Sequence, residues 1–87
     1  MLTIYKYPLE ITARQAVLLP RNAKVLQFAN QFETPMLWAL VDSEAEGERI
    51  EFRMFGTGHK IPLGVRLEYV GSAQFQGGEF VWHLFRA

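Results

Sequence analysis

The chain has 87 residues, of which 49% are hydrophobic and 14% aromatic, and its formal net charge at neutral pH is zero. This apolar content excludes a disordered main body, and the length fits a single domain over residues 1–87 with one core. Nine basic side chains balance nine acidic ones, which disfavours nucleic acid as a partner. The absence of cysteine excludes disulfides and thiolate metal sites.

No segment predicts export or insertion into a membrane. The longest apolar run, Met36 to Val41, is far shorter than the roughly 20 residues of a transmembrane helix. The amino-terminal segment lacks the basic stretch, the longer apolar run and the cleavage site of an export signal. We therefore expect a cytoplasmic protein without membrane contact.

The first half of the chain predicts short strands separated by turns. Pro8 and Pro20 end two of these strands, because proline cannot donate a ladder hydrogen bond. Thr12 is a possible N-cap for a helical turn, but Pro20 leaves no room for a longer helix. The acidic segment 42–47 predicts a solvated loop. The expected strands cover residues 2–7, 16–19, 24–30 and 36–41, the last of them apolar on both faces and therefore interior.

Strict alternation dominates the second half. Ile50, Phe52 and Met54 share one parity and charged residues take the other, as in a half-buried antiparallel strand. The run 65–69 repeats this pattern, and the same parity continued would turn Tyr69, Gly71, Ala73 and Phe75 inward, with Gly71 marking a bulge or a close approach.

A hairpin is expected at Gln76–Gly78, because glycines tolerate the positive φ of a tight turn. It leads into residues 79–85, which are apolar on both parities and predict a central strand. Together the elements predict an all-β domain, a compact antiparallel sandwich or partly open barrel of about six to seven short strands with at most one short helical turn.

One loop is the candidate ligand site. It leaves a strand through two glycines, whose backbone amides can converge on an anion, and it ends with two basic side chains. A small nucleotide is the ligand class that this arrangement suits, although the spacing matches neither nucleotide-binding glycine motif. The alternative is a glycine-rich strand exit leading to Pro62. The residues are Gly56, Thr57, Gly58, His59 and Lys60.

The aromatic side chains exceed what a small core hides on single strand faces. We expect some of them to be exposed or paired across a subunit interface, forming a homodimer or a contact with another protein. The alternative is stacking on nucleic-acid bases, which the neutral net charge disfavours. The candidate interface residues are Tyr5, Tyr7, Trp38, Phe55, Trp82 and Phe85.

Catalytic and metal-binding patterns are not found in the sequence. His59 and His83 lie in different elements without zinc-ligand spacing, and neither Ser43 nor Ser72 lies in the glycine-flanked turn of a hydrolase nucleophile. The carboxylates concentrate in the loop 42–47. We expect neither an enzyme nor a bound cofactor or metal.

A set of segments spread over essentially the whole chain carries a resemblance to a known family. These segments are Thr3–Thr12, Leu37–Asp42, Gly56–His59, Leu67–Gly71, Gly77–Gly78 and Val81–Phe85. On them the chain resembles a family of small proteins encoded by tailed bacteriophages and prophages. It departs from that family at Lys60, where proline is common.

This resemblance implies an accessory product that acts in the cytoplasm of an infected or lysogenic host bacterium. Small phage products of this kind commonly bind and block a host or defence protein, an argument by analogy. We therefore expect a non-catalytic binding protein with a host or phage protein as its partner. The alternatives are a minor structural or assembly protein of the virion and a small-nucleotide binder that uses the loop at Gly56–Lys60.

Overall fold

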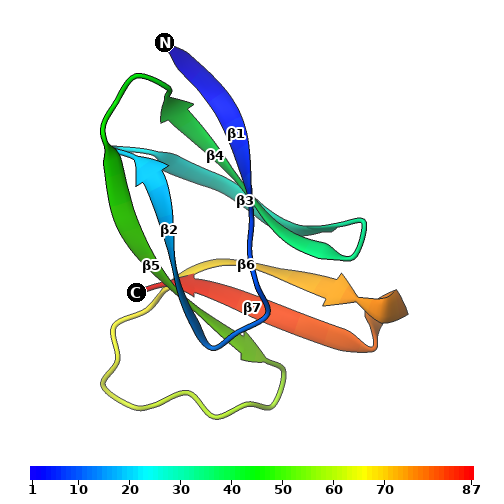
Figure 1. Ribbon diagram of the computed structural model, residues 1–87. Helices are drawn as coiled ribbons and strands as arrows, with labels where there is room; N and C mark the ends of the chain where they lie inside the picture. The colour runs from blue at the N-terminus through cyan, green and yellow to red at the C-terminus, as the bar shows by residue number, and fades with distance from the viewer.

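The computed structural model describes residues 1–87 and consists of antiparallel strands with one short 3₁₀ turn, η1 (Gln76–Gly78) (Figure 1). It confirms the expected all-β fold. It contains no helix with the length and apolar character that crossing a bilayer requires. The strands are β1 (Leu2–Pro8), β2 (Arg14–Pro20), β3 (Lys24–Gln31), β4 (Thr34–Asp42), β5 (Gly47–Gly56), β6 (Glu68–Phe75) and β7 (Phe80–Arg86).

Two open antiparallel sheets make up the fold. The first sheet has the strand order β1-β4-β3 and the second has the order β2-β5-β7-β6. Strands β4 and β7 are interior, as their apolar residues on both parities predicted. In Figure 1 the β3–β4 and β6–β7 hairpins project toward the same side of the molecule.

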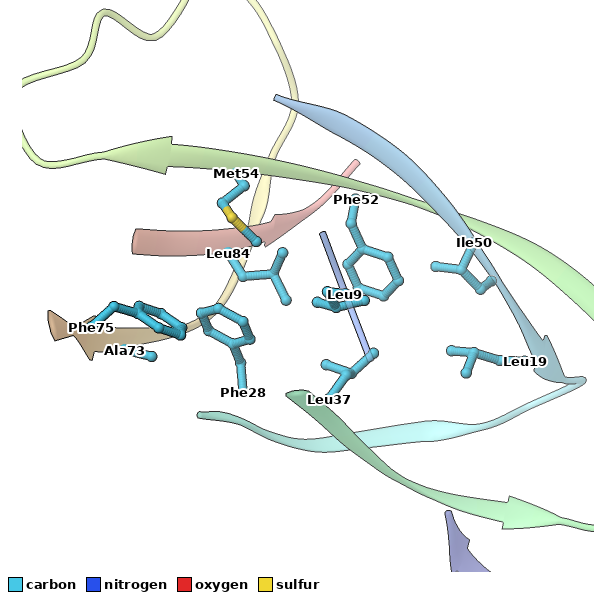
Figure 2. Close-up of a cluster of buried hydrophobic side chains, with 10 residues drawn as sticks. All are labelled: Leu9, Leu19, Phe28, Leu37, Ile50, Phe52, Met54, Ala73, Phe75 and Leu84. Atoms are coloured by element: carbon cyan, nitrogen blue, oxygen red, sulfur yellow. The ribbon is translucent and has the colours of Figure 1, made fainter. Parts of the chain in front are cut away.

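The core lies between the two sheets. Ile50, Phe52 and Met54 of β5 are buried together, which confirms the alternation seen in the sequence. They meet Leu37 of β4 and Phe28 of β3 across the interface between the sheets (Figure 2). The full buried cluster comprises Leu9, Leu19, Phe28, Leu37, Ile50, Phe52, Met54, Ala73, Phe75 and Leu84.

Strands β3 and β6 lie against each other although no ladder joins them. A Cβ atom placed on Gly71 would lie 3.4 Å from Cβ of Phe28, an ordinary van der Waals distance, so the two strands pack against each other at these residues. Nearer the β3–β4 turn, a side-chain hydrogen bond joins the two strands: Asn30 Nδ2 donates to the carbonyl of Gln74 at 2.9 Å. The sheets therefore meet at their β3 and β6 edges.

The inward position expected for Tyr69 is wrong. The register shifts between Tyr69 and Gly71, where β6 carries an irregularity of the kind made by a bulge. Tyr69 pairs with Phe85 and is 60% exposed, whereas Ala73 and Phe75 beyond the shift are buried. An extra residue in one strand reverses the faces of the residues before it, so strict alternation fails there.

Two further boundaries differ from the sequence-based expectations. Residues 11–13 form a bend, and Arg14 already begins β2, so Thr12 caps no helix. Residues 65–67 alternate in the sequence, yet they belong to the long connection between β5 and β6 and not to β6 itself.

Candidate functional site

The turn of the β3–β4 hairpin presents a bare aromatic ring. Gln31 pairs with Thr34, and the two residues between them, Phe32 and Glu33, have φ of 51° and 62°. Positive φ at both central residues characterises the type I′ hairpin turn, which asparagine and glycine favour. Phe32 is instead bulky, and it is 95% exposed. The ring thus contributes no burial that would offset its backbone strain.

The turn is held by hydrogen bonds within itself and to the neighbouring β6–β7 hairpin. Asn30 Oδ1 accepts the amide of Glu33 at 2.7 Å, and Asn30 Nδ2 donates to Glu33 Oε2 at 2.6 Å. Glu33 Oε1 accepts the amide of Gln76 at 2.8 Å. Gln76 is a third non-glycine residue with positive φ, at 51°. We call Asn30, Phe32, Glu33, Gln74 and Gln76 the hairpin tip.

Strain in the hairpin tip is concentrated. Three of the four non-glycine residues with positive φ in the chain are Phe32, Glu33 and Gln76; the fourth is Asn22. Each such conformation costs on the order of 1–3 kcal/mol, and such residues gather where a protein binds or reacts. The hairpin tip is therefore the principal candidate site.

Acid is expected to loosen the hairpin tip. Hydrogen bonds from Asn30 and from the amide of Gln76 lower the pKa of Glu33 below its ordinary value of 4.5. The carboxylate therefore stabilises the fold fully above that value, and this contribution is lost as the pH falls through the folded-state pKa.

Thermal melts of the wild type and of Glu33→Gln between pH 6 and pH 3 measure this effect. We expect the advantage of the wild type over the variant to shrink toward acid pH. A constant difference across the range would contradict the assigned role of Glu33.

The loop predicted to hold an anion is closed on itself. The amide of Gly56 donates to Nδ1 of His59 at 3.0 Å, and the amide of His59 donates to the carbonyl of Gly56 at 3.0 Å. The amide of Thr57 donates to the carbonyl of Val81 at 3.2 Å. Three of the amides that an anion cradle needs are thus already bonded within the protein. This geometry favours the alternative, a structured strand exit.

The same loop does form one wall of a groove. The groove has a volume of about 380 Å³ and contains a carboxylate, Glu79, but neither Gly58 nor Lys60 of the predicted loop site. The ring of His59 lies edge-on to Trp82, with centroids 5.6 Å apart. We call this groove the aromatic groove. Its lining residues are Gly56, Thr57, His59, Glu79, Phe80, Val81 and Trp82.

The predicted interface aromatics lie on several surfaces. Trp38 lies on the outer face of the first sheet, paired with Lys6 of β1. Tyr7 and Trp82 pack against the core, and burial raises the pKa of Tyr7, with a smaller contribution from Tyr5. Tyr5 itself is 45% exposed. These residues form no single patch.

Phe55 and Phe85 do come together, on the outer face of the second sheet. Their rings pack edge to face with centroids 5.9 Å apart, and Tyr69 continues the row at 5.5 Å from Phe85. The guanidinium of Arg53 lies 5.2 Å from the centroid of Phe55. Phe55 at one end of this row is only 6% exposed, whereas Tyr69 at the other end is 60% exposed.

His83 links three segments on that outer face. Its Nδ1 lies 2.6 Å from the hydroxyl of Ser72 and its Nε2 lies 2.8 Å from the hydroxyl of Thr57. The hydroxyl of Tyr69 completes the chain at 2.7 Å from that of Ser72. No carboxylate orients the imidazole, as a serine–histidine–aspartate triad would require. The arrangement fits a polar crosslink between β6, β7 and the turn after β5.

The acidic segment 42–47 forms a turn between β4 and β5. The amide of Glu44 and the ammonium of Met1 both donate to Asp42 and lower its pKa. All three partners are exposed, so salt screens these contacts. The structure contains no group of three or more histidine, aspartate or glutamate side chains that could hold a metal ion.

Sequence reasoning did not identify the hairpin tip. It predicted only a connection between the strands at 24–30 and 36–41, because Asn30, Gln74 and Gln76 carry no motif. Asn30 lies 44 positions from Gln74, and Gln76 lies 43 positions from Glu33. The signal that was present is a phenylalanine followed by a glutamate where a two-residue turn favours asparagine and glycine.

Comparison with known proteins identifies the family. The chain belongs to the family described as Domain of unknown function (DUF7352), whose model matches residues 1–87. Searches of the curated proteins and of the solved structures found no significant match.

Proposed function

We propose that this member of the DUF7352 family is a non-catalytic binding protein that engages a protein partner through its hairpin tip. The observation that carries the proposal is Phe32, a 95% exposed ring on a backbone with φ of 51°. Large aromatic side chains dominate the energetics of protein interfaces. Because Asn30 and Glu33 fix the turn, little backbone freedom remains to be lost when a partner closes over the ring.

A protein partner fits the charge around Phe32 better than a membrane or a nucleic acid does. Glu33 follows the ring directly, and Glu79 follows the adjoining turn η1. Carboxylates at this end of the domain repel anionic lipid headgroups and phosphate backbones. The five residues of the hairpin tip include no basic side chain, and the ammonium of Lys6 beside the tip donates to Gln31 at 2.9 Å.

The phage resemblance supports a host-directed role for the binding protein. On that analogy the domain acts in the cytoplasm of the infected bacterium, with a host protein, such as a defence component, as its target. Homodimerisation stays a prediction that rests on the aromatic content of the sequence. A place in the virion is supported by no feature of the hairpin tip.

Site-specific photocrosslinking tests the proposal. A benzophenone amino acid replaces Phe32 in one protein and Leu63, which is fully exposed in the long connection between β5 and β6, in the control. In extracts of the host bacterium we expect a discrete crosslinked protein from position 32 and none from position 63. Crosslinks to lipid alone, or equal products from both positions, would overturn the proposal.

A further inference from the structure

The aromatic groove adjoins the hairpin tip. Glu79 follows η1 directly, and its amide donates to the carbonyl of Gln76 at 3.2 Å. Phe80 then begins β7 and is 45% exposed. A partner that covers Phe32 and η1 therefore also comes close to Glu79 and Phe80, which line the groove.

The walls of the groove are preorganised rings. Gly56 gives His59 its place, because a Cβ atom on Gly56 would lie only 2.8 Å from Cε1 of His59. The bond from the amide of Gly56 to Nδ1 then fixes the orientation of the imidazole, whose edge-on contact with Trp82 has an interplanar angle of 75°. Phe80 and Trp82 have the same parity on β7, so their side chains project from one face of the strand.

The charge of the groove selects for a cation. Glu79 supplies the one carboxyl group of its lining, and no lysine or arginine lines it. The faces of tryptophan and phenylalanine rings attract cations, and a nearby carboxylate adds a charge-assisted hydrogen bond. Among protein side chains, the planar guanidinium of arginine both stacks on aromatic rings and pairs with a carboxylate through two N–H groups.

We infer that the aromatic groove binds an arginine side chain of the protein partner, stacked on its rings and paired with Glu79. This inference deepens the proposed function and rests on it for the source of the arginine. It also assigns a role to His59 and Gly56, which the sequence singled out for an anion.

Titration with N-acetyl-arginine amide, followed by amide and indole NMR signals, tests the groove directly. We expect saturable shifts at His59, Phe80 and Trp82, and no such shifts with the citrulline analogue, which has the same shape without the charge. Glu79→Gln should weaken binding at least about fivefold. Glu68→Gln, which removes an exposed carboxylate on β6 outside the groove, is the matched control and should leave the affinity unchanged.

Equal shifts with the citrulline analogue, no saturable shift at the groove, or an affinity unchanged in Glu79→Gln would overturn the inference. A failure of this inference can be distinguished from a failure of the proposed function. Saturable arginine binding without any crosslinked partner at position 32 would overturn the protein partner alone. A crosslinked partner whose affinity is the same for the wild type and Glu79→Gln would overturn the groove alone.

Discussion

Replacement of Phe32 by asparagine is expected to stabilise the domain and at the same time to abolish partner binding. Asparagine adopts positive φ readily, so the variant relieves strain on the order of 1 kcal/mol at a residue that is 95% exposed and loses no burial. A gain of about 1 kcal/mol raises the melting temperature of a domain of this size by roughly 4–8 °C. Loss of a central aromatic contact weakens a protein interface by about 30-fold or more.

Thermal melts and affinity measurements with the crosslinked partner check both halves of this expectation. Phe32→Ala is the control, because it removes the ring but leaves a side chain that does not favour positive φ. We expect it to abolish binding without the gain in stability. An asparagine variant that keeps the affinity of the wild type within about twofold would show that Phe32 makes no interface contact.

The positive φ of Phe32 and Glu33 explains why sequence rules did not reveal the hairpin tip. Turn rules describe the residues that stabilise a turn, and Phe32 and Glu33 break them. Local disagreement of this kind is expected at functional positions, where other contacts offset the strain. Here those contacts come from Asn30, Gln74 and Gln76, and only the packing of β3 against β6 brings them together.

The strands were predictable wherever burial alone decided the pattern. Ile50, Phe52 and Met54 face one core, so their period of two appears directly in the sequence. Tyr69 was placed on the wrong face because one irregular residue in β6 shifts the register, and only Gly71 signalled it. Residues 65–67 alternate in the sequence but form no strand, because a strand needs a neighbouring strand to pair with as well as an alternating pattern.

The sequence singled out the loop at Gly56–Lys60 as an anion site, and that assignment stays a prediction. Glycine there was interpreted as freeing backbone amides for a phosphate. In the structure Gly56 instead makes room for the ring of His59, which occupies the amide and contacts Trp82 on another strand. A sequence shows that a glycine is present, but the group that uses the space comes from the tertiary fold.

The largest loss of stability is expected for Phe52→Ala. Phe52 lies in the central part of the core and is 1% exposed, in contact with both sheets through the cluster that includes Leu37 and Leu84. Removing a buried phenylalanine ring costs about 3–5 kcal/mol, because the transfer free energy is lost and a cavity remains. A domain of this size is stable by only roughly 4–13 kcal/mol, so the variant should be largely destabilised at physiological temperature.

Urea unfolding of Phe52→Ala beside Phe32→Ala makes the comparison sharp, because the two variants delete the same atoms at 1% and 95% exposure. The exposed site should change the unfolding free energy by less than about 0.5 kcal/mol. Equal losses at the two positions would mean that the ring of Phe32 is buried in solution, and the hairpin tip would then be part of the core. A large loss at Phe52 alone leaves Phe32 as a side chain that the folded domain does not need, which is the property expected of a residue reserved for a partner.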